Sequence, residues 1–269
     1  MSVRCKKQRL MWKKSRTGLT VELAATEQEV LESQRLRYQL FSEALGQQAS
    51  NECSGIDVDH YDAYCHHLLV RDYYKGTVVG CTRILTKSQA HHAGGFYAEK
   101  EFDIGKFSPL REKTMEVGRT CIHPDYLNSG AMLILWAGLS RLIDIHQVDY
   151  MMGCASIPLL NGHRSAQAAI QYLRERYPAP SHLRIAPRRP FQLDDTVTAD
   201  KRQLPLMLET YLHLGAHAWG EACLDSELNA VNLFFLLDTA NLNPSYRSHC
   251  MERKLGSAIK GGGVGPVYL

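Results

Sequence analysis

The chain has 269 residues, 45% of them hydrophobic and 22% charged, so it can bury the core of one large domain and disorder is not expected. Its net charge of +3 is too small to favour nucleic-acid binding, and no stretch interleaves basic and aromatic residues as a base-stacking surface would. The longest run of apolar residues and glycine, Gly130 to Leu139, has ten residues and is too short to span a membrane.

Residues 1–18 are predicted to form a basic N-terminal tail. The first 16 residues contain seven lysines and arginines and no acid. Such a segment either touches anionic lipid or remains a solvated, disordered terminus. Because no apolar stretch follows the basic start, we expect no cleaved signal and a cytoplasmic protein, and the tail leaves peripheral attachment to the inner membrane open.

The tail is followed by a predicted strand at 19–25 and a helix. The helix opens with a capping box of Thr26 and Glu29 and ends near Gly46. Arg37 falls on the apolar stripe of this helix. It must therefore be paired if it is buried, because an uncompensated interior charge costs several kcal/mol.

The predicted partners of Arg37 are Asp59 and Asp62, which lie in a loop before an antiparallel pair of strands. The two strands, HHLLVRDYY at 66–74 and TVVGCTRIL at 77–85, are apolar runs joined by a short turn.

A polar-faced strand then precedes a second helix. In a regular strand Glu116 and Arg119, three residues apart, would face opposite ways. A bulge at Gly118 would insert one extra residue and restore a common face. We therefore expect a carboxylate and a guanidinium to meet there.

The helix after this strand buries apolar residues at spacings of four, three and four and is expected to end near His146. Asn128 or Ser129 is predicted to cap it. Its first free amides, in the run Asn128, Ser129, Gly130 and Ala131, are then expected to form an anion site at the end of the strand.

The rest of the chain completes a sheet. A strand at 150–158 precedes an insert at 161–202, whose eight lysines and arginines against four acids make it the basic face of the molecule. A helix near 204–218 and strands near 219–223 and 230–237 follow. Alternating strands and helices with at least one hairpin favour a three-layer α/β fold.

Neither disulfides nor a metal site are expected. The eight cysteines show no paired short spacing, and several lie in apolar strand runs, as reduced core thiols do. Cys121 has no visible activating partner and is expected to pack in the core. His213 and His217 are four apart on an expected helix, but no glutamate follows the first, so they are poor metal ligands.

Six blocks of the chain, in order, resemble the bacterial ornithine N-acyltransferases of ornithine lipid synthesis, members of the GNAT acyltransferase superfamily. The resemblance runs from about Leu19 to Arg247. The blocks are LRYQLF (36–41), GIDVDHYDAYCHHLLVRD (55–72), VVGCTRIL (78–85), GGFYAEKEFDI (94–104), EVGRTCIHPDY (116–126) and YMMGCASIP (150–158).

The resemblance implies a GNAT-like α/β fold, with a mixed central sheet covered by helices. We expect a single domain at 19–247 that contains the helical basic insert at about 161–202, and a flexible, glycine-rich C-terminal tail at 248–269. The implied reaction moves a 3-hydroxyacyl chain from acyl carrier protein to the α-amine of L-ornithine, forming lyso-ornithine lipid.

The same resemblance implies roles for the charged residues. Glu116 is the expected general base or amine-orienting carboxylate, and Arg119 either holds it or binds the substrate carboxylate. A structural ion pair is the alternative. The residues expected around the amino-acid pocket are Arg37, Asp59, Asp62 and Arg83; they could instead form a salt-bridge network that never touches substrate.

The acyl donor is inferred from a departure from the family pattern. The usual GNAT phosphate turn is Q/R-x-x-G-x-G/A, whereas DYLNSGA at 125–131 supplies one glycine. This favours the single phosphodiester of the phosphopantetheine of acyl carrier protein over coenzyme A, with no permanently bound cofactor. An acidic carrier would suit the insert, with Arg188 and Arg189 as docking residues; a solvated face is the alternative.

Two other functions stay open. The charged residues also resemble the signature of acyl-homoserine lactone synthases, which would use S-adenosylmethionine, although Gly118–Arg119–Thr120 and HPDY at 123–126 favour the ornithine family. A non-catalytic acyl-carrier or membrane-binding module is the second alternative. The aromatic residues of the fourth block, Phe96, Tyr97 and Phe102, either line an acyl tunnel or belong to the core.

Overall fold

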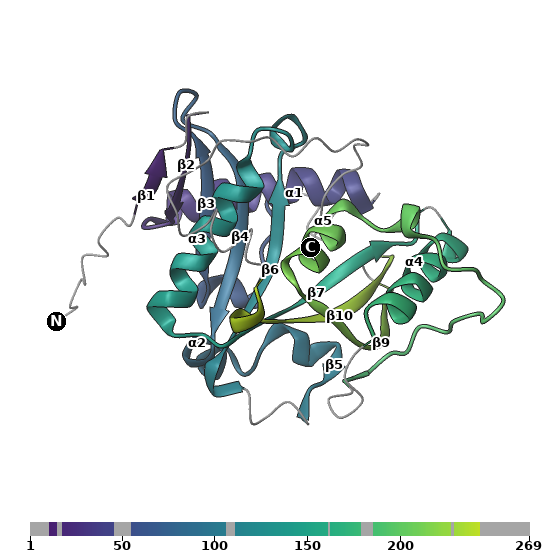
Figure 1. The fold of residues 1–269 in the computed structure, drawn as a ribbon. Coiled ribbons are helices and arrows are strands. Elements are labelled where there is room, and N and C mark those ends of the chain that lie inside the picture. Colours follow the sequence, from purple (N-terminus) through teal and green to yellow (C-terminus); the bar gives the residue numbers. More distant parts are fainter. Residues whose placement is uncertain are drawn as a thin grey trace.

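The structure is a computed structural model that describes residues 11–14, 18–45, 55–105, 111–160, 162–178, 185–226 and 229–242. Most of the predicted basic tail and all of the predicted C-terminal tail at 248–269 lie outside the described residues. Figure 1 shows the described part as one twisted sheet with helices on both faces.

The main sheet has eight strands in the order β1-β2-β3-β4-β6-β7-β10-β9, and every neighbouring pair is antiparallel except β6 and β7. A two-stranded sheet pairs β5 with β8. The strands are β1 (Met11–Lys14), β2 (Leu19–Leu23), β3 (His66–Asp72), β4 (Val78–Thr86), β5 (Phe102–Asp103), β6 (Thr114–Ile122), β7 (Tyr150–Pro158), β8 (Ala186–Pro187), β9 (His217–Asp225) and β10 (Ala230–Asp238).

Five α-helices and two short 3₁₀ helices carry the residues discussed below. They are α1 (Glu27–Leu45), α2 (Lys87–Ala93), α3 (Ala131–His146), α4 (His163–Arg176), α5 (Leu206–Leu214), η1 (His60–Ala63) and η2 (Tyr97–Lys100). The mixed α/β sheet covered by helices, predicted from the sequence, is confirmed.

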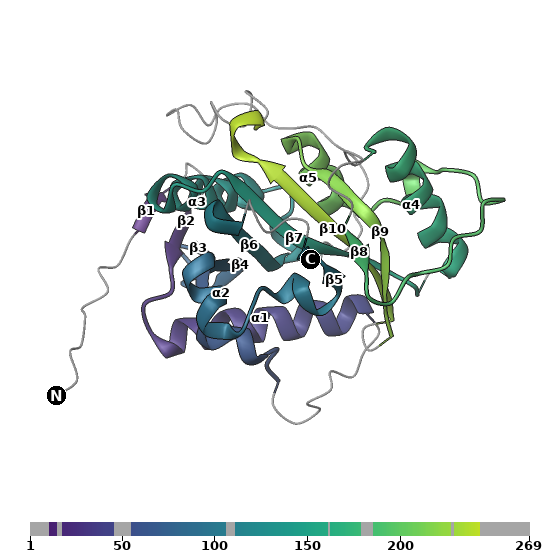
Figure 2. The same cartoon turned by 90° about the horizontal axis from the view of Figure 1, so that it is seen from below.

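The two faces of the sheet bury different helices because side chains alternate along a strand. Leu68 of β3 packs in the core beneath α3, whereas its neighbour Leu69 packs with Leu36 and Leu40 of α1. Trp136 of α3 also meets an aromatic ring of α5. Thus α3 and α5 cover one face and α1 covers the other, as Figure 2 shows.

Strands β6 and β7 separate after a short parallel pairing. Their register runs only from Thr114 opposite Tyr150 to Glu116 opposite Met152. Beyond that point β6 continues against β4, and β7 continues against β10. The two strands visibly diverge in Figure 1. This split opens the middle of the sheet.

Local rules predicted the first helix well and the start of α3 wrongly. The capping box is present, since Thr26 Oγ1 accepts the Glu29 amide and Glu29 accepts the Thr26 amide. At α3, however, neither Asn128 nor Ser129 is the cap. The N-cap residue is Gly130, whose φ of 82° suits glycine, and no side chain caps the helix. Gly130 has no side chain that could accept a first-turn amide.

Histidine and cysteine positions are also settled. α5 ends at Leu214, and His217 is the first residue of β9. The prediction that His213 and His217 lie on one helix is therefore wrong. Cys121 is buried, as expected, with its sulfur 3.5 Å from that of Cys81. Within the described ranges, no helix is long and apolar enough to cross a bilayer.

Candidate active site

The predicted bulge is present in β6. Gly118 lies opposite Arg83, and Cys121 lies opposite Cys81, so β6 carries one residue more than β4 between these pairs. The residue with the unusual backbone is Arg119, with a φ of 52°, rather than Gly118. A left-handed arginine costs conformational energy, and such strain is retained mainly at functional sites.

The bulge turns Glu116 and Arg119 into one cavity on the α1 face. Both line a space of about 510 Å³, part of it open to solvent, together with Arg83, Tyr61 and Tyr97. The shared face predicted from the sequence is therefore confirmed.

Glu116 and Arg119 nevertheless do not pair. Of the two expected roles of Arg119, holding the Glu116 carboxylate is therefore not seen, and neither is the alternative of a structural ion pair between the two residues. Glu116 Oε2 accepts the Tyr97 amide and Oε1 accepts the Ala98 amide, each at 2.7 Å. These are the first amides of η2, so the carboxylate anchors the turn that presents Tyr97. Each carboxylate oxygen has a second lone pair that can accept a further proton.

Burial changes the acidity of Glu116. The residue is 4% exposed, and this burial raises its pKa to about 7, against the opposing effect of the hydrogen bonds from Ala98 and Tyr97 and the charge of Arg83. A carboxylate with a pKa near neutrality can take a proton and give it back at physiological pH. This is the property that a general base requires.

Arg37 is the buried charge that the helix pattern predicted. It is 1% exposed and pairs with Asp57 through Nε at 2.7 Å and with Asp62 through Nη1 at 2.8 Å. Asp62 was a predicted partner, whereas Asp59 was predicted in place of Asp57. Because three aspartates lie within six residues of the same loop, sequence spacing could not tell which two would reach Arg37.

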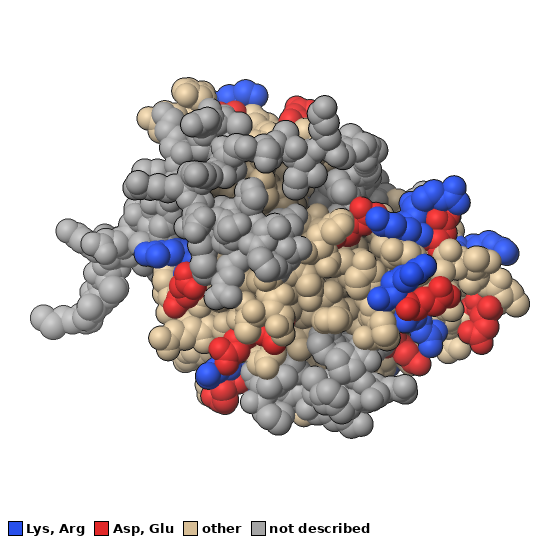
Figure 3. All heavy atoms as spheres, viewed as in Figure 1, with Lys and Arg blue, Asp and Glu red and all other residues tan. Residues whose placement is uncertain are grey.

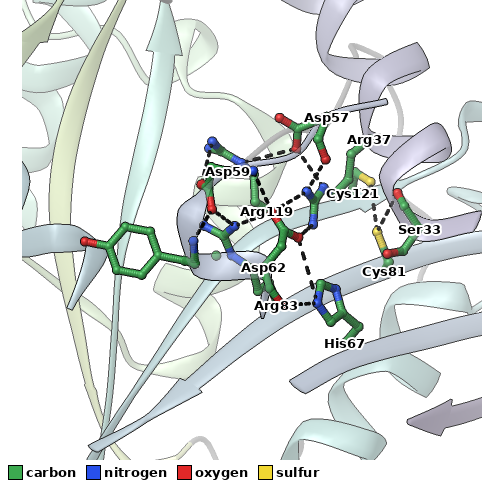
Figure 4. Close-up of polar contacts among 12 residues, drawn as sticks. Ser33, Arg37, Asp57, Asp59, Asp62, His67, Cys81, Arg83, Arg119 and Cys121 are labelled. Atoms are coloured by element: carbon green, nitrogen blue, oxygen red, sulfur yellow. Dashed lines mark hydrogen bonds and ion pairs between the residues drawn. The ribbon is translucent and has the colours of Figure 1, made fainter. Parts of the chain in front are cut away.

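Asp59 instead joins two other arginines. It accepts from Arg83 Nη1 at 2.6 Å and from Arg119 Nη2 at 3.3 Å, while Arg83 Nη1 also reaches Asp62 at 3.0 Å. The cluster therefore holds three arginines and three aspartates, as Figure 4 shows. Its local fold is a capping box in which Asp59 accepts the Tyr61 amide and Asp62 accepts the Asp59 amide.

Charge pairing keeps the aspartates ionised. Burial would raise the pKa of Asp62, but its contacts with Arg37 and Arg83 outweigh burial and hold that pKa well below its usual range. The pKa of Asp59 is lowered in the same way, since Arg83 outweighs burial. The predicted cluster of Arg37, Asp59, Asp62 and Arg83 is thus assembled, with Asp57 and Arg119 as added members.

One donor of this cluster remains unused. Arg119 Nε lies 3.3 Å from Asp57 Oδ2 but does not point at it, and this buried N–H has no hydrogen-bond acceptor in the described part of the chain. A buried donor without an acceptor is costly. Since Arg119 lines the cavity, its guanidinium group is a candidate partner for a ligand carboxylate.

A second, apolar cavity lies on the α3 face of the same split. Its space of about 340 Å³ is lined largely by methionine, alanine and aromatic side chains, including Met151, Ala216 and Phe235. Val117 and Cys154 belong to the walls of both cavities. The charged cavity and the apolar cavity are therefore neighbours, on opposite faces of the sheet at the split between β6 and β7.

The predicted phosphate-binding residues surround the start of α3. Ser129 Oγ donates to Tyr126 O at 2.7 Å, Asn128 is exposed, and Gly130 and Ala131 begin the helix. Because no side chain caps α3, its first-turn amides remain available to an anion. The predicted anion site keeps its backbone donors, although Asn128 and Ser129 do not cap the helix.

Arg188 and Arg189 are exposed, and each is tied to the backbone of a neighbour: Arg188 Nε donates to Glu99 O and Arg189 Nε to Leu224 O. They follow β8, which pairs with β5 at the lower edge of Figure 1, whereas α3 begins at the upper edge. In Figure 3 the basic side chains around α4 alternate with acidic ones. Nothing in this placement links the pair to the start of α3.

Sequence reasoning missed one member of the arginine–aspartate cluster, Asp57, as a partner of Arg37. Asp57 could have been found by its spacing, since it precedes Asp59 by two positions. Of the three aromatics left open, Phe96 and Phe102 are core residues, whereas Tyr97 lines the cavity. Within the described ranges, no cluster of three or more histidines, cysteines or acids could hold a metal ion.

Comparison with known proteins places these features in a family context. The family model for the acetyltransferase (GNAT) domain matches residues 36–137, which confirms the GNAT-like character of the fold. The L-ornithine N(alpha)-acyltransferase of Rhodobacter capsulatus is 31% identical over 88% of this chain and 96% of that protein. The enzyme of the same name from Brucella abortus is 27% identical over 86% of this chain and 88% of that protein.

Solved structures show a more distant likeness. The AHL synthase LasI is 18% identical, with a TM-score of 0.46 over 82% of this chain and 90% of that one. FeeM, an N-acyl amino acid synthase from uncultured soil microbes, is 12% identical, with a TM-score of 0.47 over 86% of this chain and 94% of that one.

Proposed function

The chain belongs to the family of L-ornithine N(alpha)-acyltransferases, and we propose that it transfers a 3-hydroxyacyl chain from acyl carrier protein to the α-amine of L-ornithine, forming lyso-ornithine lipid. Membership of this family makes the chain an acyltransferase rather than a non-catalytic module.

The observation that carries the proposal is the pair of cavities at the split between β6 and β7. The charged cavity suits an amino acid, because it offers a buried carboxylate, Glu116, and an unused guanidinium donor on Arg119. The apolar cavity suits a fatty chain. A thioester held in the gap would meet the amine at the boundary of the two spaces, which is the positioning that acyl transfer needs.

The reaction follows from these positions. The substrate carboxylate binds Arg119, and Glu116 accepts a proton from the α-amine. The nitrogen forms a bond to the thioester carbon, the carbon–sulfur bond breaks, and the sulfur leaves as a thiol after taking up that proton. Beyond Glu116 and Met152, β6 and β7 no longer pair with each other. Backbone N–H groups on their facing edges can therefore donate hydrogen bonds to the amide carbonyl oxygens of the phosphopantetheine arm and to the developing oxyanion.

The remaining residues of the cluster hold the loop before β3 in place beside the cavity. Arg83 and Arg37 fix the loop of Asp57, Asp59 and Asp62 against the sheet, and Arg83 also lines the cavity. Because the three aspartates offset the charge of the three arginines, Arg119 can be buried beside the cavity without leaving an uncompensated charge before substrate binds.

We infer that the donor arm enters over the start of α3. The uncapped amides at Gly130 and Ala131 would hold its phosphodiester, with Asn128 and Ser129 at the rim. No permanently bound cofactor is required for this transfer. Since the product is a lipid, we place the enzyme in the cytoplasm with peripheral contact to the inner membrane.

The proposal is tested by Glu116→Gln in a purified assay of thiol release from 3-hydroxyacyl carrier protein with L-ornithine. We expect kcat/KM to fall about 10²- to 10⁴-fold, because the variant keeps the shape of the side chain and loses the base. Glu112→Gln is the matched control, since Glu112 is 71% exposed and lies just before β6. Equal rates for Glu116→Gln and the control would exclude Glu116 as the base.

The pH dependence supplies a second readout. The base must be ionised, and its pKa is raised to about 7, so kcat/KM should fall as the pH drops below about 7 in the wild type. Glu116→Gln should lack this limb. Mass spectrometry of the product separates an acylated ornithine from a lactone made with S-adenosylmethionine, the product expected of the alternative synthase.

A further inference from the structure

The wall of the apolar cavity contains one phenol that the mechanism above does not use. Among the described residues that line this cavity, only Tyr211 of α5 has a side chain with an oxygen or nitrogen atom. The one thiol of the wall belongs to Cys154 and is hydrogen-bonded to Glu101. Tyr211 therefore supplies the hydroxyl group that a polar substituent on a ligand in this cavity would meet.

The ring of Tyr211 is held by aromatic neighbours. Its centroid lies 5.6 Å from that of Trp136 on α3 and 6.4 Å from that of Phe235 on β10. Tyr211 is 8% exposed. A ring packed in this way cannot turn out of the wall without losing these contacts. Its hydroxyl group therefore has a fixed place.

The hydroxyl end of Tyr211 lies at β6. It is hydrogen-bonded to Thr120, whose Oγ1 atom lies 2.6 Å from Thr82 Oγ1 on β4. Thr82 Oγ1 in turn donates to Gly118 O at 3.3 Å. Both threonines are 1% exposed. Three hydroxyl groups thus form a buried chain that ends at a carbonyl group of the bulge.

That carbonyl group sets the direction of the protons in the chain. A carbonyl oxygen can only accept, so Thr82 gives its proton to Gly118 and Thr120 gives its proton to Thr82. Tyr211 then donates to Thr120, and the phenol oxygen keeps its lone pairs. A ligand hydroxyl group can donate to those lone pairs, whereas a methylene group or a ketone cannot.

The phenol oxygen lies near the boundary of the two cavities. Its partner Thr120 follows Arg119, which lines the charged cavity, and Val117 of the same strand lines both. In the proposed reaction the thioester carbon lies at this boundary, and carbon 3 of the acyl chain is two carbons further in. A hydroxyl group on carbon 3 therefore enters the apolar cavity at the end where Thr120 holds Tyr211.

We propose that Tyr211 recognises the 3-hydroxyl group of the acyl donor, which makes the enzyme selective for 3-hydroxyacyl chains. The inference rests on the proposed function and adds the residue that selects its donor. The 3-hydroxyl group donates to Tyr211 Oη, while Thr120 and Thr82 hold the phenol in the orientation that accepts this proton.

The test measures kcat/KM with L-ornithine and carrier-bound acyl chains of one length that bear a 3-hydroxyl group, a 3-oxo group or neither. In Tyr211→Phe, kcat/KM for the 3-hydroxyacyl donor should fall about 10-fold, because a neutral hydrogen bond is lost. The values for the other two donors should change less than about 2-fold, since neither chain gives Tyr211 a proton. Tyr172→Phe, the same change at a half-buried tyrosine of α4 outside both cavities, should behave as wild type.

Each other outcome has a definite meaning. An equal loss for all three donors in Tyr211→Phe would show that the phenol only ties α5 to β6, and an unchanged 3-hydroxyacyl rate would show no role at all; either result overturns the inference. If the variant does not fold, the wild type decides with the two mirror-image 3-hydroxyacyl donors, because only one of them can direct its hydroxyl group at Tyr211. Equal kcat/KM for that pair would also overturn the inference. Failure of the wild type to acylate ornithine with any donor would overturn the proposed function instead.

Discussion

The two cavities at the split of β6 and β7 differ in the charge of their walls. The cavity on the α1 face has Glu116, Arg83 and Arg119 among its lining residues. The cavity on the α3 face is walled by residues such as Met151, Ala216 and Phe235. Alternation along β6 and β7 builds both at once, since adjacent residues point to opposite faces.

The difference between the cavities shows how one sheet can hold two unlike substrates. An amino acid needs partners for its charges once water is removed, whereas a fatty chain needs only apolar surface. The proposed transfer takes place at the gap between β6 and β7, where Val117 and Cys154 belong to both walls.

The largest expected effect tests whether the ion pairs of Arg37 stabilise the folded protein. Arg37→Met would leave the half-buried Asp57 and the buried Asp62 without their shared cation, so we expect the free energy of unfolding to fall by about 3–5 kcal/mol. Urea denaturation measures the change. Arg35→Met, two residues away and exposed on the same helix, should cost little. Similar losses in the two variants would mean that the buried network contributes little stability.

A smaller effect tests whether the charged cavity binds the amino acid. Arg119→Gln removes the unused donor, and we expect the KM for ornithine to rise roughly 10- to 100-fold, the range for a lost hydrogen bond between charged groups. The KM for the acyl donor should stay constant. Lys113→Gln, whose side chain is 66% exposed, is the control. A raised donor KM with an unchanged ornithine KM would reverse the assignment of the two sides.

A larger side chain in the apolar cavity tests whether the acyl chain binds there. Ala216 lines the cavity and is 2% exposed, so Ala216→Leu should shorten the space available to the acyl chain. We expect the rate with the longest acyl donors to fall about 10-fold relative to short ones, with a stability loss of about 1–3 kcal/mol from overpacking. The ratio of rates across a series of chain lengths is the measurement. An unchanged profile would place the acyl chain elsewhere.

The smallest effect concerns the carrier rather than either cavity. If Arg188 and Arg189 contact an acidic carrier, reversing both charges should raise the KM for the carrier about 5-fold at low salt and less at high salt. Arg174→Glu, at an exposed position of α4 in the same insert, is the control. An equal effect of all reversals would indicate general attraction, and no effect would favour docking near the start of α3.

Most of the fold could be predicted because the signals are local. Periodicity and turn residues within short windows predicted the capping box at Thr26 and Glu29 and the hairpin of β3 and β4. They also predicted the C-terminal end of α3 and the bounds of β7. The start of α3 was the exception. Asn128 and Ser129 are good caps by type, but the turn reverses at Gly130, whose positive φ suits a residue without a side chain.

The candidate site was predicted in part. A buried Arg37 had to be paired, and the bulge had to bring Glu116 and Arg119 to one face; both inferences need only chemistry and strand geometry. Which partner each charge would take could not be predicted, because Asp57, Asp59 and Asp62 are equivalent in type and nearly so in position. Glu116 bonds instead to backbone amides of η2, for which residue type carries no signal.

The sequence by itself therefore determined which residues had to be buried, paired or exposed, since those demands arise from the side chains and their immediate neighbours. Only the tertiary structure decided which groups satisfy them. It separated β6 from β7 after three pairs of residues, and it brought Glu101 to Asn232 from 131 positions away along the chain. Such contacts depend on how the sheet is ordered and twisted, and no short window of sequence contains that information.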